Sequence, residues 1–282
     1  MGVYSRRAQD FIEEKASAFD IEEKLVYKTL RDDPEARLLI YFHGNTATLA
    51  QGRRTEEYRI YSSGASDNIF VLTFDYRGFG KSTGYPSESG LLNDAEAIVD
   101  WALNTVGISP DRIVLLGHSL GTAVSTGIAH HYANLDTPIE FAGLILCAAF
   151  TNTGNAFSAY SIGGVVPILA PVKLIPSFQA WFSRQMHDSW RTDQRLAALA
   201  KQCENLQLVL VHAENDGTMP WNQTELLFSS TLKSATDGMQ PVLKVVDLGE
   251  AGRQEIWRVG KRRISKLIAK HGGEFSSRMR RM

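Results

Sequence analysis

Short apolar runs rich in Leu, Ile and Val recur along this chain of 282 residues, and longer segments with helical periodicity separate them. Each run has the length of one buried strand. Strands that alternate with helices form a mostly parallel sheet with helices on both faces. The sequence therefore predicts an α/β fold whose strands include Leu38–Phe42, Ile69–Phe74, Ile113–Leu116, Leu144–Cys147 and Leu206–Val211.

The segments between these runs predict helices that cover the sheet. One helical face between the second and third runs carries Leu92, Ala95, Val99 and Ala102. A second helix is expected to begin at Ser119, because the small residues Ala123 and Gly127 suit close packing. From about residue 150 to 198 the alternation breaks down, and we interpret this stretch as a cap inserted into a single domain of residues 1–282.

Charge and composition exclude several classes of protein. Thirty Lys and Arg against 31 Asp and Glu leave a net charge of -1, which is a poor match for a nucleic-acid partner. Cys147 and Cys203 lack the spacing of a disulfide scaffold or a zinc site. The N-terminus has no apolar signal region, and prolines interrupt the apolar stretch 160–178, so we expect a cytoplasmic protein without a transmembrane segment.

The third predicted strand leads into Gly117-His118-Ser119-Leu120-Gly121, a G-x-S-x-G pattern at a junction of strand and helix. In this context the pattern is typical of a nucleophile elbow, a strained turn that presents a serine hydroxyl at the edge of the sheet. The two glycines remove the Cβ atoms that would clash with neighbouring backbone. We therefore predict Ser119 as a nucleophile; a plain glycine-flanked turn is the alternative.

The run ending at Phe42 continues as His43-Gly44-Asn45, a turn that can aim a backbone amide at the same point. We predict that the amides of Asn45 and Leu120 form a two-donor oxyanion hole. On the other interpretation, His43 simply packs at the end of a strand.

An acid and a base complete the predicted catalytic triad. The run ending at Val211 leads into His212-Ala213-Glu214-Asn215-Asp216, and Asp216 is our predicted acid, with Glu214 as second choice and an ordinary Asp-Gly turn as the alternative. His271 is the one histidine after Asp216. It is either the general base or an exposed residue near the end of the chain, and the residues leave both open.

These motifs together resemble the α/β-hydrolase superfamily, in the branch of monoacylglycerol and lysophospholipid lipases and related serine esterases. The most specific stretch is Phe74-Asp75-Tyr76-Arg77-Gly78-Phe79-Gly80-Lys81-Ser82, and the likeness spans about residues 38–224. The resemblance implies an acyl-enzyme mechanism with Ser119 as nucleophile, Asp216 as acid and the Asn45 and Leu120 amides as oxyanion donors. It implies neither a metal nor an organic cofactor.

The resemblance also implies a histidine just past the last strand and a closing helix after it. If residues 264–269 are that strand, Glu274 occupies the expected place of the histidine. The ending therefore resembles a truncated, alternatively spliced or wrongly predicted C-terminus, and the N-terminal membrane anchor of many members is not seen. We expect the closing helix to be missing.

The sequence thus predicts a serine hydrolase of carboxylic esters acting on a small-molecule ester or lipid, such as a monoacylglycerol or lysophospholipid. Apolar residues of the cap stretch, among them Phe157, Tyr160 and Trp181, would suit an acyl chain. The rival interpretation is a non-catalytic or inactive α/β-hydrolase domain without a working histidine. Peripheral membrane contact and the oligomeric state stay open.

A phosphate-binding loop is a weaker rival. Residues 78–83 end like such a loop, but Asp75 stands where its first glycine would be needed.

Overall fold

The computed structural model describes residues 2–4, 19–45, 48–52, 54–63, 68–154, 188–213, 216–235 and 242–247. Its strands are β1 (Gly2–Tyr4), β2 (Arg37–Phe42), β3 (Ile69–Thr73), β4 (Ile113–His118), β5 (Gly143–Cys147), β6 (Gln207–His212) and β7 (Val242–Asp247). Its helices are α2 (Phe19–Asp32), α3 (Arg54–Ser62), α4 (Glu88–Asp100), α5 (Leu120–Ala133), α9 (Thr192–Gln202) and α10 (Asn222–Ser234), with short helical turns at Trp101–Val106 and Pro110–Arg112.

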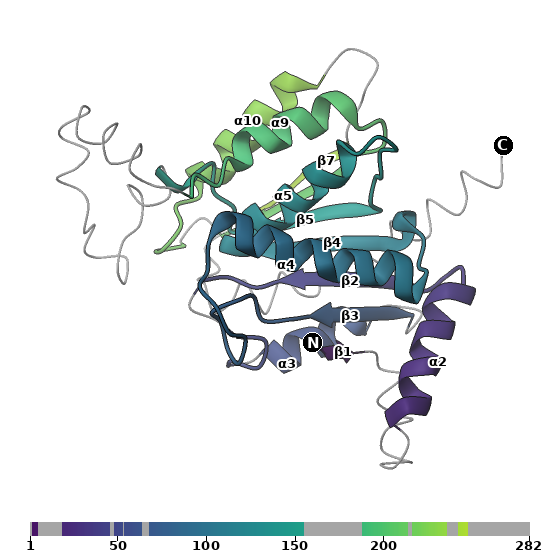
Figure 1. The fold of residues 1–282 in the computed structure, drawn as a ribbon. Coiled ribbons are helices and arrows are strands. Elements are labelled where there is room, and N and C mark those ends of the chain that lie inside the picture. Colours follow the sequence, from purple (N-terminus) through teal and green to yellow (C-terminus); the bar gives the residue numbers. More distant parts are fainter. Residues whose placement is uncertain are drawn as a thin grey trace.

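The described strands form one seven-stranded sheet in the order β1-β3-β2-β4-β5-β6-β7. Strand β1 runs antiparallel to β3 at one edge, and the remaining pairs are parallel. Figure 1 shows α4 and α5 in front of the strands, with α9 and α10 beside them. The predicted α/β architecture is therefore confirmed, because helices alternate with parallel strands along the chain.

Successive residues of the central strands point to opposite faces of the sheet, as the period of two requires. The even-numbered residues of β2, for example Leu38 and Ile40, belong to the cluster that includes residues of α4 and α5. Leu39 and Tyr41 belong to a second cluster with Tyr58 and Tyr61 of α3. Both faces of these strands are thus buried, which explains why the runs are apolar without interruption.

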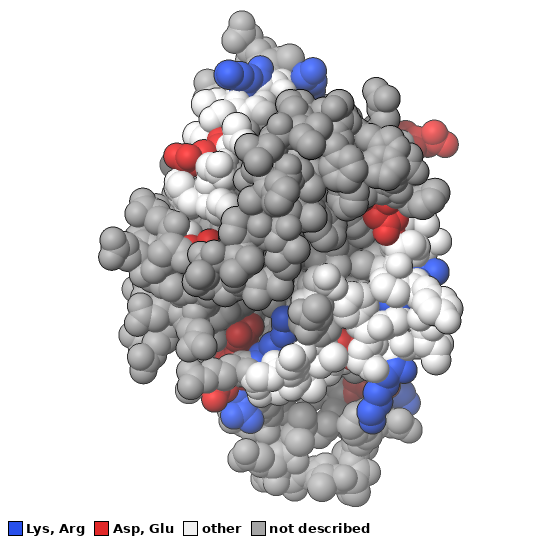
Figure 2. Space-filling view, turned by 90° about the vertical axis from the view of Figure 1, so that its left-hand side faces the viewer, with Lys and Arg blue, Asp and Glu red and all other residues white. Residues whose placement is uncertain are grey.

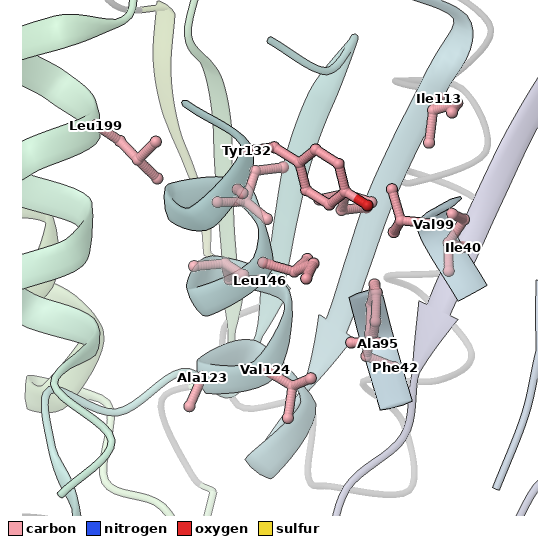
Figure 3. Packing of buried hydrophobic residues seen from close by; sticks show 14 of the residues in the cluster. Ile40, Phe42, Ala95, Val99, Ile113, Ala123, Val124, Tyr132, Leu146 and Leu199 are labelled. Carbon is pink, nitrogen blue, oxygen red and sulfur yellow. The ribbon is translucent and has the colours of Figure 1, made fainter. Parts of the chain in front are cut away.

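The two predicted helices form as expected. Helix α4 buries Ala95 and Val99 against the strands, and α5 buries Ala123 and Val124. Figure 3 shows Ala95 beside Phe42 and Val99 beside Ile40, and all four helix residues belong to one buried cluster with these strand residues and Leu146. Small residues on α5 let it pack close to the strands, and this closeness sets the position of the turn in front of it.

Two strands were not predicted from the sequence. The strand β1 has three residues, which is too short for a periodic pattern, and β7 lies at Val242–Asp247. The strand suggested for residues 264–269 lies outside the described residues. Strand β7 pairs with β6 in parallel, from Gln207 opposite Val242 to His212 opposite Asp247, so the sheet continues earlier in the chain than we expected.

The cap stretch predicted at about 150–198 lies largely outside the described residues, which omit 155–187. Its last residues belong to α9, which begins at Thr192 and buries Leu196 and Leu199 in the main core. None of the helices in the described part of the chain is long and apolar enough to span a bilayer. On the face drawn in Figure 2, described Lys and Arg side chains are interspersed with Asp and Glu.

We expect Leu146→Ala to lower the free energy of unfolding by about 2–5 kcal/mol, because Leu146 is 0% exposed in β5 and its loss leaves a cavity. Chemical denaturation measures this change. The control is Leu232→Ala on α10, where the side chain is 54% exposed and the cost should stay below about 1 kcal/mol. Equal losses in the two variants would contradict the described core.

Candidate active site

Ser119 stands in the turn between β4 and α5 with a strained backbone. Its φ of 52° and ψ of -117° are unusual for a residue with a side chain. Hydrogen bonds hold this turn: the Ser119 amide donates to the carbonyl of Cys147 over 2.9 Å, and the Thr122 amide donates to the carbonyl of Ser119 over 2.9 Å. The side chain is half-buried rather than enclosed. This conformation is the one that a nucleophile elbow requires.

Both glycines of the pattern face neighbouring backbone. A Cβ atom on Gly121 would lie 2.0 Å from the carbonyl oxygen of Phe42, and one on Gly117 would lie 2.3 Å from the carbonyl oxygen of Gly121. Neither position has room for a side chain, because the nearest neighbour of each is a main-chain oxygen that cannot move aside easily. The close approach that we expected from the sequence is therefore present.

The turn after β2 lies directly beside Ser119. A Cβ atom on Gly44 would lie 3.2 Å from the Cβ of Ser119 and 3.1 Å from Nδ1 of His118. This proximity follows from the register, since Phe42 of β2 is opposite Gly117 of β4. Asn45, the next residue, is exposed. The turn that carries the predicted oxyanion donor thus borders the serine.

The second predicted donor is the amide of Leu120. Leu120 is the first residue of α5, and the first amides of a helix have no partner within the helix. The positive end of the helix dipole lies at the same place and favours developing negative charge. The start of α5 can therefore stabilise an oxyanion formed next to Ser119.

Asp216 lies in the loop after β6 with its carboxylate buried. One oxygen, Oδ1, accepts hydrogen bonds from the amides of Thr218 over 2.8 Å and Met219 over 3.0 Å. The other oxygen, Oδ2, lies 3.8 Å from Nε2 of His212. These contacts hold the carboxylate in one orientation. Glu214, the second choice for the acid, lies outside the described residues.

His212 is fully buried, and its two ring nitrogens already have partners. Nε2 lies 2.8 Å from the carbonyl oxygen of Met219, and Nδ1 lies 2.6 Å from the hydroxyl of Thr224. A carbonyl can only accept, so Nε2 carries the proton and donates it, while Nδ1 accepts from Thr224. This arrangement suits a histidine that stabilises the acid loop rather than one that exchanges protons with Ser119.

The strand register places Ser119 and Asp216, the predicted acid, at one edge of the sheet. His118 is opposite Cys147 in β5, and Cys147 is opposite Val211 in β6. Since all three strands are parallel, the segments after them leave from the same edge. The next strand on that side, β7, ends at Asp247, and the chain beyond it, which includes His271 and Glu274, lies outside the described residues.

His43 is buried against the turn and packs on aromatic rings. Its ring centroid lies 4.3 Å from that of Tyr76, and its Nδ1 lies 2.9 Å from the carbonyl oxygen of Gly44. Burial lowers the pKa of His43 from its ordinary value to about 4, and the hydrogen bond to Gly44 opposes this shift. His43 is therefore neutral near pH 7.

The two ends of the predicted cap are tied to each other and to the main domain. The amide of Thr153 donates to the carbonyl of Ser189 over 3.1 Å. The carboxylate of Glu88 accepts from the amide of Trp190 over 2.8 Å and from the guanidinium of Arg195 over 2.7 Å. The sequence did not predict these contacts of Glu88, because residues about a hundred positions apart leave no local pattern.

A second tie joins the first end of the cap stretch to helix α10. The side-chain oxygen of Gln223 accepts from the hydroxyl of Thr151 over 2.8 Å. Helix α10 follows the loop of Asp216 in the chain, so this bond links the base of the cap stretch to the element next to the acid.

Cys147 is 1% exposed at the end of β5, and burial raises the pKa of its thiol to about 12. A thiol in this state is a poor nucleophile. Cys147 therefore acts as a small buried apolar residue, and its carbonyl supports the turn at Ser119.

Comparisons with known proteins identify the family of the fold. A family model described as "Alpha/beta hydrolase family" matches residues 39–244. "Protein ABHD12B" of Homo sapiens is 33% identical over 193 residues, which cover 68% of this chain and 49% of that protein. "Lysophosphatidylserine lipase ABHD12" of Gallus gallus is 31% identical over 195 residues, which cover 68% of this chain and 46% of that protein. The chain spans about half the length of these curated relatives.

Solved structures share the fold. The crystal structure of an alpha-beta hydrolase from Vibrio vulnificus superposes with a TM-score of 0.60 at 19% identity, over 85% of this chain and 73% of that one.

We expect Gly121→Ala to lower the free energy of unfolding by about 3 kcal/mol, because its Cβ would overlap the carbonyl oxygen of Phe42. The matched control is Gly143→Ala in β5, where a Cβ meets nothing nearer than 3.6 Å and the change should be within about 0.5 kcal/mol. Urea denaturation of both variants gives the two values. The close contact of α5 with β2 would be contradicted by equal stabilities.

We expect the buried His43 to make the fold less stable in mild acid. The unfolded chain binds a proton at His43 below about pH 6.5, whereas the folded chain binds it only below pH of about 4. The neutral His43 therefore contributes fully to the free energy of unfolding above about pH 6.5, and this contribution is lost as the pH falls toward 4. Between pH 7 and pH 5 the loss should be about 2 kcal/mol. His43→Gln should show a smaller loss over that interval in denaturation at both pH values; the same pH dependence in both proteins would contradict the assignment.

Proposed function

Because the chain belongs to the alpha/beta hydrolase family, we propose that it hydrolyses carboxylic esters through an acyl-enzyme on Ser119. The single observation that carries this proposal is the backbone of Ser119. Its φ of 52° costs the fold about 1–3 kcal/mol of strain, and the surrounding contacts preserve it beside the turn at Gly44. A strained turn of this kind has a clear use in presenting a nucleophile.

In the proposed mechanism the hydroxyl oxygen of Ser119 attacks the ester carbonyl carbon while a general base takes the hydroxyl proton. The amides of Asn45 and Leu120 stabilise the tetrahedral oxyanion, and the base returns the proton to the departing alcohol. Water then attacks the acyl-enzyme by the same route and releases the carboxylic acid. Asp216 orients the base, and His271 is our candidate for that base.

The relatives support a lipid monoester as substrate. The name of the relative from Gallus gallus refers to lysophosphatidylserine, which is a lysophospholipid with one acyl ester. We therefore propose a monoacylglycerol or lysophospholipid as substrate. The apolar residues of the cap stretch that we expected to contact the acyl chain, from Phe157 to Phe182, lie outside the described residues.

A fluorophosphonate probe tests the nucleophile directly, because it forms a covalent bond only with an activated serine. We expect the folded wild type to be labelled and Ser119→Ala to be unlabelled. Ser89→Ala, on the exposed side of α4, should label like the wild type. His271→Ala should lose at least about 10⁴-fold in labelling rate if His271 is the base.

Two outcomes would reverse parts of this proposal. No labelling of folded wild-type protein would favour the rival interpretation, a non-catalytic domain with the same fold. Unchanged labelling of His271→Ala would remove His271 from the mechanism. For the substrate, hydrolysis should increase along a series of esters from acetyl to long-chain acyl groups, and a clear preference for acetyl would reject the lipid assignment.

A further inference from the structure

Asp75 and Tyr76 follow strand β3 and contact the segment that leaves β2. They belong to the motif from Phe74 to Ser82, which the proposed mechanism does not use. Strands β2 and β3 are parallel neighbours, with Tyr41 opposite Thr73, so the two segments after them lie side by side. The contacts between them involve both ends of the turn that carries Asn45, which are His43 at the near end and Leu49 at the far end.

The far end of the turn is held at Leu49 through both of its backbone polar groups. The amide of Leu49 donates to Oδ1 of Asp75 over 2.7 Å, and its carbonyl accepts from the hydroxyl of Tyr58 over 2.8 Å. The bond to Asp75 joins residues 26 positions apart and has a charged acceptor, which makes it stronger than a bond between neutral groups. Leu49 is therefore fixed relative to β3 and α3.

The near end of the turn is held at His43. The hydroxyl of Tyr76 donates to the carbonyl of His43 over 3.1 Å. The same carboxylate oxygen of Asp75 that binds Leu49 lies 3.5 Å from Nε2 of His43. Because Nδ1 of the neutral His43 ring donates to Gly44, Nε2 has no proton for the carboxylate, and Tyr76 is the residue that holds this end of the turn.

The carboxylate of Asp75 is itself kept in place by its own loop. Gly80 has a φ of 56°, and a Cβ atom there would lie 2.1 Å from Oδ2 of Asp75. The hydroxyl of Ser82 donates to the carbonyl of Asp75 over 2.8 Å. Only glycine at position 80 leaves room for the carboxylate, so the motif is built around this side chain.

We propose that Asp75 is a positioning residue: by holding Leu49 it fixes the far end of the turn after β2, whose near end Tyr76 holds at His43, so that the amide of Asn45 faces the oxyanion formed at Ser119. This inference rests on the proposed function, since it assigns a task within the same site. Asp75 does not touch the reacting atoms. Its effect reaches them through Gly44, which lies against Ser119.

The test compares Asp75→Ala, which removes the acceptor, with Asp75→Asn, which keeps an oxygen for the amide of Leu49. Hydrogen exchange of the Leu49 amide reports the turn without any need for catalysis. We expect exchange about tenfold faster in Asp75→Ala and close to the wild-type rate in Asp75→Asn. In ester hydrolysis, kcat of Asp75→Ala should fall about 10- to 100-fold with little change in KM, because oxyanion donors act in the transition state.

A control separates this role from general loosening of the loop. Asp94 binds Arg77 in the same loop through two side-chain nitrogens and the backbone amide but does not contact the turn after β2. Asp94→Ala should therefore leave Leu49 exchange at the wild-type rate. Thermal unfolding shows whether each variant is folded. If Asp75→Ala does not fold, the test rests on Asp75→Asn, which should keep the wild-type exchange rate at Leu49 and the wild-type kcat.

Several results would overturn the inference. They are unchanged Leu49 exchange in folded Asp75→Ala, faster exchange without a fall in kcat, an equal effect in Asp94→Ala, or an Asp75→Asn variant in which Leu49 exchanges freely. If the wild type shows no turnover, the proposed function fails instead. Exchange at Leu49 then still decides whether Asp75 holds the turn.

Discussion

The first turn of helix α5 packs against the main chain at the end of β2, and the candidate site depends on this contact. Gly121 leaves no space between itself and the carbonyl of Phe42. The contact places the turn after β2 next to Ser119. It also helps to hold Ser119 in a backbone conformation whose strain costs about 1–3 kcal/mol. Burial of Ala123, Val124 and the rest of that helix face offsets the strain, because apolar area removed from water contributes about 25 cal/mol per Å².

Two loops at this edge of the sheet are held in the same way. In both, a side-chain carboxylate accepts from backbone amides: Asp216 binds the amides of Thr218 and Met219, and Asp75 binds the amide of Leu49. A carboxylate that accepts amide hydrogen bonds gives a loop a single arrangement without a helix or strand. The edge can therefore carry several functional groups while the sheet supplies their spacing.

Contacts between distant parts of the chain complete the arrangement. Glu88 at the start of α4 binds Trp190 and Arg195, and Gln223 of α10 binds Thr151. These bonds fix both ends of the stretch predicted as a cap to elements on two sides of the site. The two ends therefore cannot separate without breaking these bonds.

Strands β2 to β6, helices α4 and α5 and the tight turn at Ser119 could be predicted from the sequence, because apolar periodicity and the need for glycine at close backbone contacts are local properties. Strand β7 was not predicted. We placed the last strand at residues 264–269 because the resemblance implies a histidine directly after it, whereas β7 lies at Val242–Asp247. Three contacts became visible in the folded protein alone: Asp75 binds the amide of Leu49 beside His43, His212 binds the loop of Asp216 at Met219, and Glu88 binds the amide of Trp190. Such pairings arise from the register of parallel strands and the packing of helices, which bring together residues that no local pattern connects.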